Sequence, residues 1–566
     1  MASDNLGFTL ASCAFFMALV AAFAYVQTRG KVATSDGYFL AGRGLTGTFI
    51  AGSLLLTNLS AEQLIGLNGS AYGFNMTAMA WEVTAGFAII IMALVFLPRY
   101  LNGAFSTLPQ FLEERFDPGV RKITVVLFLA GYGLITMPSI LYSGSLAVVR
   151  LFDVSRLLDV SPEVALVVTI IVVGMSGAAY AIFGGLRAVA VSDTINGIGL
   201  LVIGAIVPFF GLVALGGGDA VAGLTIVLTE DTDKLNAIGS SDDPVPFGTL
   251  FTGMILANLF YWGTNQYVIQ RTLGARSLSE GQKGVLLSGF FKLLVPVFMM
   301  LPGVIAYHLY GGTLTHMDLA YPTLVADVLP TYLAGFFLAV LLGAVFSSVN
   351  SLQNSAATLF VLDVYQPLAQ TQPTDADLIR IARIASVVIA LFSFLVAPFL
   401  QFAPDGLWQL IRVFTGFYNI PVVTLVLVGL FTARVPPVAA KVVIVFHVVA
   451  YGLLQFVFDI DVSFIHIYAV LFVIEVAIML ILGRTHPTPP RPHAERPAVD
   501  MTPWRFAVPT SIILITCIAL TYLLFSPIGL VGGLESRFFL AAGAVLAVAT
   551  FGCWWSERWR SSRVAP

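Results

Sequence analysis

The stretch LLLTNLSAEQLIGLNGSAYG, residues 54–73, begins as an apolar helix and then departs from that pattern. Polar residues and glycines crowd its second part: Thr57, Asn58, Ser60, Glu62, Gln63, Gly66, Asn68 and Gly69. An acid and amides at this position need a physical reason, because unsatisfied polar groups are costly in lipid.

The composition shows that the stretch lies in a membrane. The chain has 566 residues, of which 58% are hydrophobic and 10% charged, whereas a soluble protein carries about 25% charged residues. Apolar runs of roughly 20 residues, the length that crosses a bilayer, recur from end to end. We predict an all-α polytopic membrane protein with no separate soluble domain. About fifteen spans are expected, at residues 7–28, 47–73, 77–99, 122–149, 163–183, 189–214, 246–272, 282–308, 332–364, 379–402, 406–432, 436–458, 463–483, 504–526 and 537–555.

Lys and Arg are distributed unevenly between alternate loops. With the N-terminus outside, 22 of the 28, Arg271 among them, lie in cytoplasmic loops, four lie in outer loops and two lie inside spans. Positive residues collect on the cytoplasmic side, so we predict an external N-terminus. The first segment has no Lys or Arg before its apolar run and is expected to be a retained helix, not a signal peptide.

Composition also argues against several classes of function. The net charge of −3 argues against a nucleic-acid partner. The six histidines show no metal-ligand spacing and no pairing with a nucleophile, so no enzyme is expected. A channel lacks a repeated filter motif, and a sensor lacks a signalling domain after residue 555, although both remain as alternatives of another class.

A second span is interrupted in a similar way. Residues 246–272 contain Asn258, Gly263, Thr264, Asn265 and Gln266, and five spans separate the starts of the two interrupted segments. The second therefore enters the membrane from the opposite side. Two interrupted helices at corresponding positions of oppositely oriented halves are the sequence sign of an inverted-repeat transporter.

Irregular backbone at membrane depth survives only when it is buried in protein or lines a wet cavity. Its freed carbonyls can coordinate a cation, and its freed N–H groups can hold polar solutes. A kinked but purely structural helix is the alternative, which matched, amide-rich breaks disfavour.

Ionisable residues inside spans are treated as candidates for function, because each is expensive to bury. Glu82, Lys292 and Arg412 lie within spans, and Asp193 begins one. Glu82 and Lys292 also fit a buried ion pair that holds two helices together. Asp363, at the end of a span, is expected to cap or pair locally.

The span at 332–364 carries a polar face. Ser347, Asn350, Ser351 and Asn354 follow the i, i+3, i+4, i+7 spacing of one helix face, and Ser348 lies beside it. Such a face either bonds helices together or offers hydroxyl oxygens to a hard monovalent cation. In the second case, sodium takes hydroxyls here and carbonyls from the broken span at 47–73.

Several motifs resemble the sodium:solute symporter family, and within it the sodium/sugar cotransporter branch. They are DGYFLAGRGL, NLSAEQLIG, AIFGGLRAV with SDT, ANLFYWGTNQYVIQRTL, SEGQKG and SSVNSLQNSAAT with LDVY, between residues 36 and 432. The resemblance implies a five-plus-five inverted repeat of the leucine-transporter type and sodium-coupled uptake by alternating access. It implies a flanking helix at 1–35, a core at 36–432 with repeats 36–214 and 246–432, and accessory helices at 433–566.

The resemblance also implies site residues. The sodium site maps to the carbonyls of Leu56, Leu59 and Ala344 and the hydroxyls of Ser347 and Ser348. A weaker second sodium site maps to Asp193, Ser347, Asn350 and Ser351. The sugar-binding set maps to Gln63, Glu82, Asn258, Lys292 and the nearby Asn58, with Arg412 at a further substrate position. The gates map to Tyr261 on the cytoplasmic side and to Leu67, Trp81 and Trp408 on the outer side.

Arg412 departs from the sugar-transporter pattern, in which Gln is usual. Its planar cation suits carboxylates, so an acidic sugar or another organic solute is the alternative to a neutral hexose or polyol. A pairing of Arg412 with Glu82 keeps the site neutral and favours the neutral sugar. The expected partners are sodium, a small sugar and the bilayer of a cell membrane, for which the compact loops favour a bacterial inner membrane.

Overall fold

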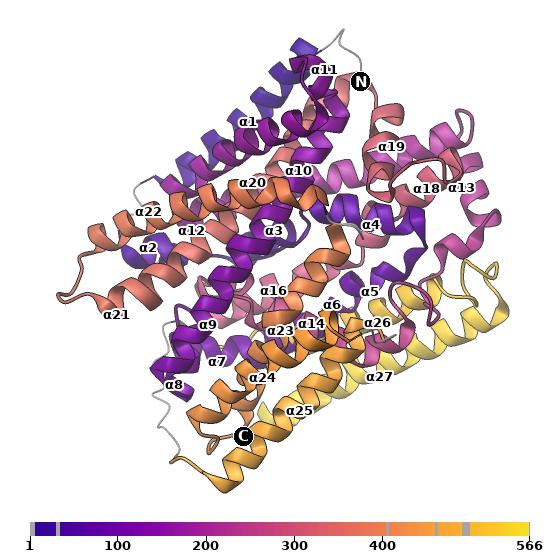
Figure 1. Ribbon diagram of the computed structural model, residues 1–566. Helices are drawn as coiled ribbons and strands as arrows, with labels where there is room; N and C mark the ends of the chain where they lie inside the picture. The colour runs from indigo at the N-terminus through magenta and orange to yellow at the C-terminus, as the bar shows by residue number, and fades with distance from the viewer. Residues whose placement is uncertain (1–5, 30–33, 403–406, 459–461, 490–498, 565–566) are drawn as a thin grey trace.

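The structure, a computed structural model, is helical throughout the residues it describes, which are 6–29, 34–402, 407–458, 462–489 and 499–564 (Figure 1). Side chains at 178–185, 401–402, 407–410 and 559–564 lie outside that description. Within it there are no β-strands, only the isolated bridges Leu45–Ala275 and Ser277–Asp500. The α-helices are α1 (Leu6–Thr28), α2 (Ser35–Leu40), α3 (Gly47–Asn58), α4 (Ala61–Gly73), α5 (Met79–Val83), α6 (Ala85–Ile91), α7 (Leu97–Asn102), α8 (Leu108–Arg115), α9 (Pro118–Gly131), α10 (Met137–Phe152), α11 (Val154–Leu158), α12 (Pro162–Leu215), α13 (Ala220–Thr229), α14 (Gly253–Leu259), α15 (Gln266–Leu273), α16 (Leu278–Lys292), α17 (Val295–Met299), α18 (Leu301–Tyr310), α19 (Ala320–Val328), α20 (Ala334–Thr358), α21 (Gln366–Leu368), α22 (Asp375–Val396), α23 (Leu407–Phe431), α24 (Pro437–Phe456), α25 (Phe464–Thr485), α26 (Ala507–Leu524) and α27 (Ser536–Val564).

The helices agree with a multi-pass membrane protein. The described residues contain 11 helices long and apolar enough to span, or up to 13 if each of two bent pairs is one span. The two remaining predicted spans are also helical. The range 163–183 lies within α12, where Pro162–Gly177 counts as a shorter apolar helix. The range 246–272 is divided into short pieces, so no single helix in it reaches spanning length.

The first bent pair is the predicted broken span. α3 and α4 meet at 56°. Leu59 leaves the helical conformation with φ −80° and ψ 80°, and Ser60 is extended before α4 begins. Ser favours such a position, because its side chain competes with the helical ladder. The predicted interruption between residues 54 and 73 is confirmed.

The second bent pair was not predicted. α16 and the helices that follow it bend by 49° between Lys292 and Val295. Pro296 lacks an N–H, so the carbonyl of Lys292 loses its helical donor. Leu293 and Leu294 then bond three residues back, to Phe290 and Phe291. This proline was the signal that could have located the bend.

The span at 246–272 breaks in the middle of the bilayer segment. α14 passes into a wide helical turn, η8 (Phe260–Thr264), and Asn265 is extended with φ −76° and ψ 117° before α15 begins. The Asn265 N–H donates to the Phe260 carbonyl at 2.8 Å. Both interruptions predicted from the sequence are therefore present. The first has Ser60 at its extended position, and the second has Asn265.

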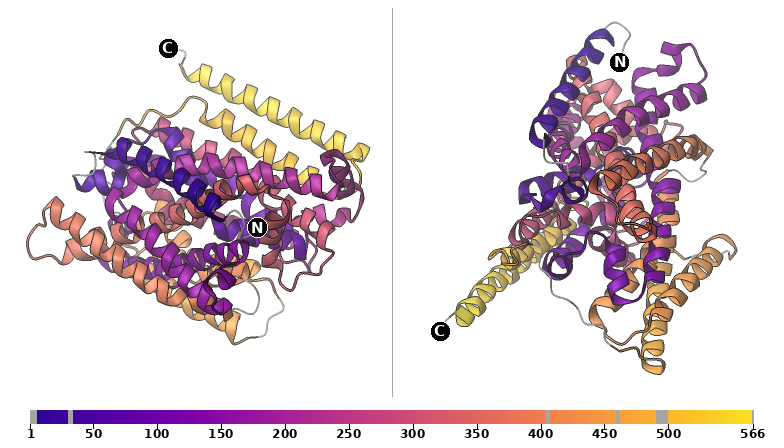
Figure 2. Two further views of the ribbon diagram at one scale, coloured as in Figure 1. Left: turned by 90° about the horizontal axis from the view of Figure 1, so that it is seen from above. Right: turned by 90° about the vertical axis from the view of Figure 1, so that its left-hand side faces the viewer.

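The broken spans lie inside the bundle. α12 packs against α3 and α20, and α3 also packs against α16. α1 lies along α20 at one edge, whereas α26 and α27 lie at the opposite edge (Figures 1 and 2). α24 and α25 pack on each other and on α23. The peripheral helices therefore shield a centre in which polar backbone is tolerated.

Asp363 is paired, but its partners come from distant parts of the chain and not from the local cap that the sequence suggests. Its Oδ1 accepts the Thr107 hydroxyl at 3.0 Å and lies 2.6 Å from Nη2 of Arg121. Arg121 also pairs with Glu113. These bonds join the start of α8 to the end of the polar span, which makes the acid structural.

Gly303 allows α18 to approach the second half of the broken span. Its N–H donates to Oδ1 of Asn68 at 2.8 Å, and an added Cβ would lie 2.1 Å from the Asn68 carbonyl oxygen. We predict that Gly303→Ala lowers stability by about 1–3 kcal/mol through overpacking. Thermal unfolding in detergent measures this. Gly543→Ala is the control, because no atom lies within 4 Å of its added Cβ, and equal melting temperatures for the two variants would contradict the packing.

Candidate functional site

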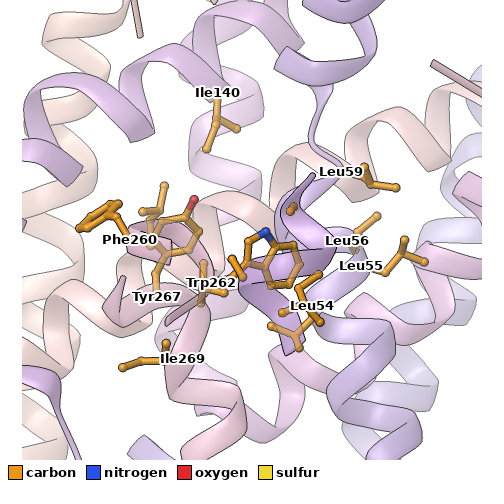
Figure 3. Packing of buried hydrophobic residues seen from close by; sticks show 14 of the residues in the cluster. Leu54, Leu55, Leu56, Leu59, Ile140, Phe260, Trp262, Tyr267 and Ile269 are labelled. Atoms are coloured by element: carbon orange, nitrogen blue, oxygen red, sulfur yellow. The ribbon is translucent and has the colours of Figure 1, made fainter. Parts of the chain in front are cut away.

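The break in the first interrupted span frees two carbonyls. In an unbroken helix, the N–H groups of Ser60 and Gln63 would donate to the carbonyls of Leu56 and Leu59. Here Ser60 donates to the Asn58 carbonyl at 3.0 Å, and Gln63 donates to the Ser60 carbonyl at 3.2 Å. Leu56 and Leu59, the two residues mapped to the sodium site, therefore lose their helical partners. Figure 3 shows both leucines in the packed centre of the molecule.

The hydroxyls mapped to the same site are buried in α20. Ser347 is 2% and Ser348 1% exposed. Oγ of Ser348 has no hydrogen-bond partner in the described part of the chain, and the hydroxyl of Ser347 lies beside the carboxylate of Asp193. Ser351, one turn on, instead donates to the Ser347 carbonyl at 2.6 Å. α20 packs on α3 and α4, and the hydroxyls of Thr57 and Ser351 lie 3.5 Å apart. An unsatisfied hydroxyl next to freed carbonyls fits a hard cation such as sodium. Ala344 lies one turn earlier on α20, and its side chain is fully buried.

Arg271 stands beside the residues mapped to a second sodium site. The charge pattern places Arg271 in a cytoplasmic loop, but its side chain is fully buried. Its Nη2 bonds the hydroxyl of Ser351 and lies 3.8 Å from Oδ2 of Asp193. Ser53 bridges them, accepting from Nε of Arg271 and donating to Asp193, both at 2.7 Å. A fixed cation therefore already faces Asp193. Asn350 lines a small pocket together with Ser347 and residues of α1.

A small pocket lies between α4, α5, α14, α15, α23 and α25. Its lining residues are Glu62, Gln63, Trp81, Thr136, Ala257, Phe260, Tyr261, Asn265, Tyr267, Ile411, Arg412, Thr415, Tyr418, Asn419 and Tyr468. Of the sequence-predicted substrate and gate residues, Gln63, Arg412, Trp81 and Tyr261 are among them. In Figure 3 the rings of Phe260, Trp262 and Tyr267 lie across from the leucines of α3.

Two further predicted substrate residues, Glu82 and Lys292, are buried outside the pocket lining. Nε2 of Gln63 donates to Oε1 of Glu82 at 3.0 Å, and Nζ of Lys292 pairs with Oε2 of the same carboxylate. Lys292 also lies 5.5 Å from the centre of the Trp262 ring. Oε1 of Gln63 has no partner among the described residues. The bonded series from Lys292 through Glu82 to Gln63 thus ends at the pocket, in the unpartnered amide oxygen of Gln63.

Asn258 donates to the Thr84 hydroxyl at 3.0 Å, and Asn58 lies beside the hydroxyl of Tyr261. Both asparagines are buried, but neither lines the pocket. Leu67 is fully buried and also lies outside the lining. The side chain of Trp408 lies outside the described residues.

Amides in the second break are divided between the pocket and the scaffold. Oδ1 of Asn265 accepts the Tyr132 hydroxyl at 2.6 Å, and Asn265 lines the pocket. Gln266 accepts from the backbone N–H of Leu108 at 2.8 Å and so holds the start of α8. A polar residue at a break therefore does not always belong to the binding pocket.

Arg412 and Glu62 bring opposite charges to the same pocket. The guanidinium carbon of Arg412 lies 4.5 Å from the centre of the Trp81 ring. Glu62 also lines the pocket, and its Oε2 has no hydrogen-bond partner within the described ranges. One carboxylate oxygen of Glu62 is therefore left for a group that enters the pocket.

Sequence reasoning missed the rest of the α23 wall. Arg412, Thr415 and Asn419 follow i, i+3, i+7 spacing, with Tyr418 between the last two. The same rule that found the serine face could have found this one. Tyr468 lies on α25 and had no local signal, because its role depends on the packing of a later helix.

The Glu82–Lys292 pair predicts a stability cycle. Lys292→Met leaves a buried carboxylate uncompensated and should cost about 3–5 kcal/mol, whereas Glu82→Gln combined with Lys292→Met should recover much of this loss. Lys441→Met is the matched control, because its pair with Asp117 is partly exposed and should cost no more than about 1 kcal/mol. Thermal unfolding in detergent measures all four proteins. A double variant as unstable as Lys292→Met would contradict the pairing.

Comparison of whole structures shows the fold. The chain is similar to a solved Na+-coupled sialic acid symporter with a TM-score of 0.73 and 20% identity, covering 86% of this chain and 99% of that one. It is also similar to Mhp1, a nucleobase-cation-symport-1 family transporter, with a TM-score of 0.52 and 14% identity, covering 81% and 96%. These likenesses confirm the predicted leucine-transporter-type helical fold.

Comparison of sequences shows the family. The sodium:solute symporter family matches residues 38–440. An Escherichia coli (strain K12) protein described as uncharacterized symporter YidK is 45% identical over 492 residues, 87% of this chain and 86% of that protein. The sodium/glucose cotransporter of Vibrio parahaemolyticus is 32% identical over 425 residues, 71% and 76% of the two chains. The chain therefore belongs to the sodium:solute symporter family and is a sodium-coupled solute symporter, not an enzyme.

Proposed function

We propose that this symporter imports a neutral hexose or polyol through the pocket between α4 and α23. The observation that carries the proposal is the chain from Lys292 through Glu82 to Gln63, which ends in an unpartnered amide oxygen. Buried acceptors and donors fixed in this way suit the hydroxyls of a sugar, because a ligand without them would leave buried polar groups unpaired.

The charges around the pocket support a neutral solute. Lys292 compensates Glu82 directly, and Glu62 and Arg412 place one acid and one base in the lining. Acids and bases around the pocket are therefore matched one to one before the solute enters. Its aromatic walls, among them Trp81, Tyr261 and Tyr418, offer the apolar faces on which a sugar ring packs. The similarity to the glucose cotransporter of Vibrio parahaemolyticus points the same way.

For sodium we propose one ion, held by the carbonyls of Leu56, Leu59 and Ala344 and the hydroxyls of Ser347 and Ser348. The freed carbonyls of Leu56 and Leu59 and the buried hydroxyl of Ser348 support this donor set, whereas the Ala344 carbonyl lies in the unbroken α20 and comes from the family resemblance. We do not extend it to Asp193 and Ser351, because the guanidinium of Arg271 already supplies the positive charge there.

One ion is energetically sufficient. Its passage through 100 mV releases about 2.3 kcal/mol, and a tenfold concentration gradient adds about 1.4 kcal/mol. Together these allow accumulation of a neutral solute by several hundred-fold.

The break gives a direct route for coupling. Sodium between α3 and α20 would fix the start of α4, and Gln63 lies on the first turn of that helix. Gln63 is also the pocket residue bonded to Glu82. Each ligand would then raise the affinity for the other by the same factor.

Removal of one hydroxyl tests the sodium site. Ser348→Ala should raise the sodium concentration for half-maximal stabilisation by about tenfold, the effect of losing roughly 1.4 kcal/mol of binding. Sodium-dependent thermal stabilisation without solute is the measurement, with choline replacing sodium at constant ionic strength. Ser386→Ala is the control, because Ser386 is equally buried but its hydroxyl donates to the Ala382 carbonyl. An unchanged sodium dependence in Ser348→Ala would contradict the assignment of the Ser348 hydroxyl to the sodium site.

A solute panel tests the substrate class. D-glucose, myo-inositol and N-acetylneuraminic acid are compared for sodium-dependent thermal stabilisation and for counterflow in proteoliposomes. We expect one of the two neutral solutes to act and the acid to be inert. Arg412→Gln should weaken the neutral solute by about tenfold or less, because it unbalances Glu62 but keeps a hydrogen-bonding side chain.

Other outcomes of the panel separate the alternatives. Stabilisation by the acid that Arg412→Gln abolishes would replace the neutral sugar with an acidic one. Binding without counterflow would indicate a sensor, and unsaturable flux would indicate a channel.

A further inference from the structure

Three side chains from the accessory helices bond to the backbone of the pocket helix. The Tyr468 hydroxyl on α25 donates to the Arg412 carbonyl at 2.7 Å. The Tyr451 hydroxyl on α24 donates to the Val413 carbonyl at 2.8 Å. Nε2 of His447, also on α24, lies 2.9 Å from the Gly416 carbonyl. All three bonds fall within the stretch of α23 that supplies the pocket wall.

His447 is held by a second buried group. Its Nδ1 bonds Oε1 of Glu475 on α25, and the other carboxylate oxygen accepts the Thr424 hydroxyl of α23 at 2.6 Å. His447 and Glu475 are both fully buried. The Gly416 carbonyl only accepts, so Nε2 carries a proton. A further proton lies between Nδ1 and the carboxylate, because two acceptors would repel each other. The pair therefore closes a loop of bonds that begins and ends on α23.

The packing around these bonds is tight. An added Cβ at Gly416 would lie 2.5 Å from the ring of Tyr451, so only glycine lets the ring approach. The rings of His447 and Tyr451 stack with centroids 5.6 Å apart. Phe417 meets Tyr451 edge to face at 5.0 Å. The bonds are thus set in a rigid aromatic cluster.

The same turns of α23 line the pocket. The helix presents four side chains to the pocket: Arg412, Thr415, Tyr418 and Asn419. The carbonyls bonded by the accessory helices lie in the same two turns. Tyr468 also lines the pocket with its own side chain. α25 lies entirely beyond residue 440, where the family match ends. The solute pocket is incomplete without it.

We propose that His447 and Glu475 are positioning residues for solute binding, and that with Tyr451 they set the orientation of the α23 wall, while Tyr468 is a binding residue supplied by an accessory helix. Specificity for the solute then depends on α24 and α25, whereas the sodium site on α3 and α20 does not. The inference rests on the pocket being the solute site proposed above.

Conservative and disruptive variants distinguish positioning from charge. In Glu475→Gln, the amide can donate to Nδ1 of a neutral His447 and still accept the Thr424 hydroxyl, so the loop of bonds survives. In Glu475→Leu and His447→Leu, the loop is lost. We expect the leucine variants to raise the half-saturating concentration of D-glucose or myo-inositol about fivefold or more, the effect of losing about 1 kcal/mol. Glu475→Gln should restore most of this affinity.

Two measurements on the full-length protein keep the test independent of folding and of the solute. Hydrogen–deuterium exchange should rise in peptides covering residues 411–424 of the leucine variants and remain at wild-type levels in α3 and α20. The sodium concentration for half-maximal stabilisation, without solute, should not change. Ser511→Ala is the control, because Ser511 is a buried accessory-helix residue whose hydroxyl bonds only within its own helix, to the Ala507 carbonyl.

The outcomes separate this inference from the proposed function. Wild-type exchange at 411–424 in His447→Leu, or a Glu475→Gln variant as impaired as Glu475→Leu, overturns the positioning role. If the leucine variants do not fold, Tyr451→Phe replaces them, since it removes the bond to the Val413 carbonyl and keeps the ring. If the wild-type protein binds neither sugar, the proposed function is wrong. The positioning role is still tested in that case, because hydrogen–deuterium exchange at residues 411–424 does not depend on the solute.

Discussion

The structure depends on the requirement that every polar backbone group at membrane depth find a partner. α3 ends at Asn58 and α4 begins at Ala61, so the chain between them exposes carbonyls and N–H groups that lipid could not satisfy. α12, α16 and α20 surround the break. The break is therefore stable only as part of the assembled bundle, and the same unsatisfied groups that make it costly make it suited to a cation.

A second constraint is charge. Buried charge is expensive unless it is paired, and the buried acids of the described core have a cation or a proton-bearing partner on another helix. Glu82 has Lys292, Asp193 has Arg271, Asp363 has Arg121, and Glu475 has His447. The first three pairs join helices far apart in the sequence, whereas His447 and Glu475 join the neighbouring helices α24 and α25. Glu62 differs, because it faces the pocket together with Arg412.

Local patterns allowed the helical class, the two amide-rich breaks and the buried serine face to be predicted, because periodicity and backbone breakers act within a few residues. Partners could not be predicted in the same way. Arg271 looked like a loop residue, yet it is buried against Ser53 and Ser351. The bend after Lys292 depended on Pro296, whose effect is local but was overlooked. Tyr468 reaches the pocket only through the packing of α25 on α23, which no sequence window contains.

Because of these constraints, the proposed sodium donors and the α23 wall of the pocket are held in place by different helices. The carbonyls and hydroxyls that suit sodium stand on α3 and α20, which pack on α12 in the centre. The α23 wall of the proposed solute pocket is held instead by carbonyl bonds to α24 and α25. Pro421 leaves the Phe417 carbonyl without its helical donor, so α23 is weakened one turn beyond the wall and gains most from outside support. Gln63 belongs to both halves, since it follows the break and faces the pocket. A change in the accessory helices can therefore alter the solute wall and leave the sodium donors in place.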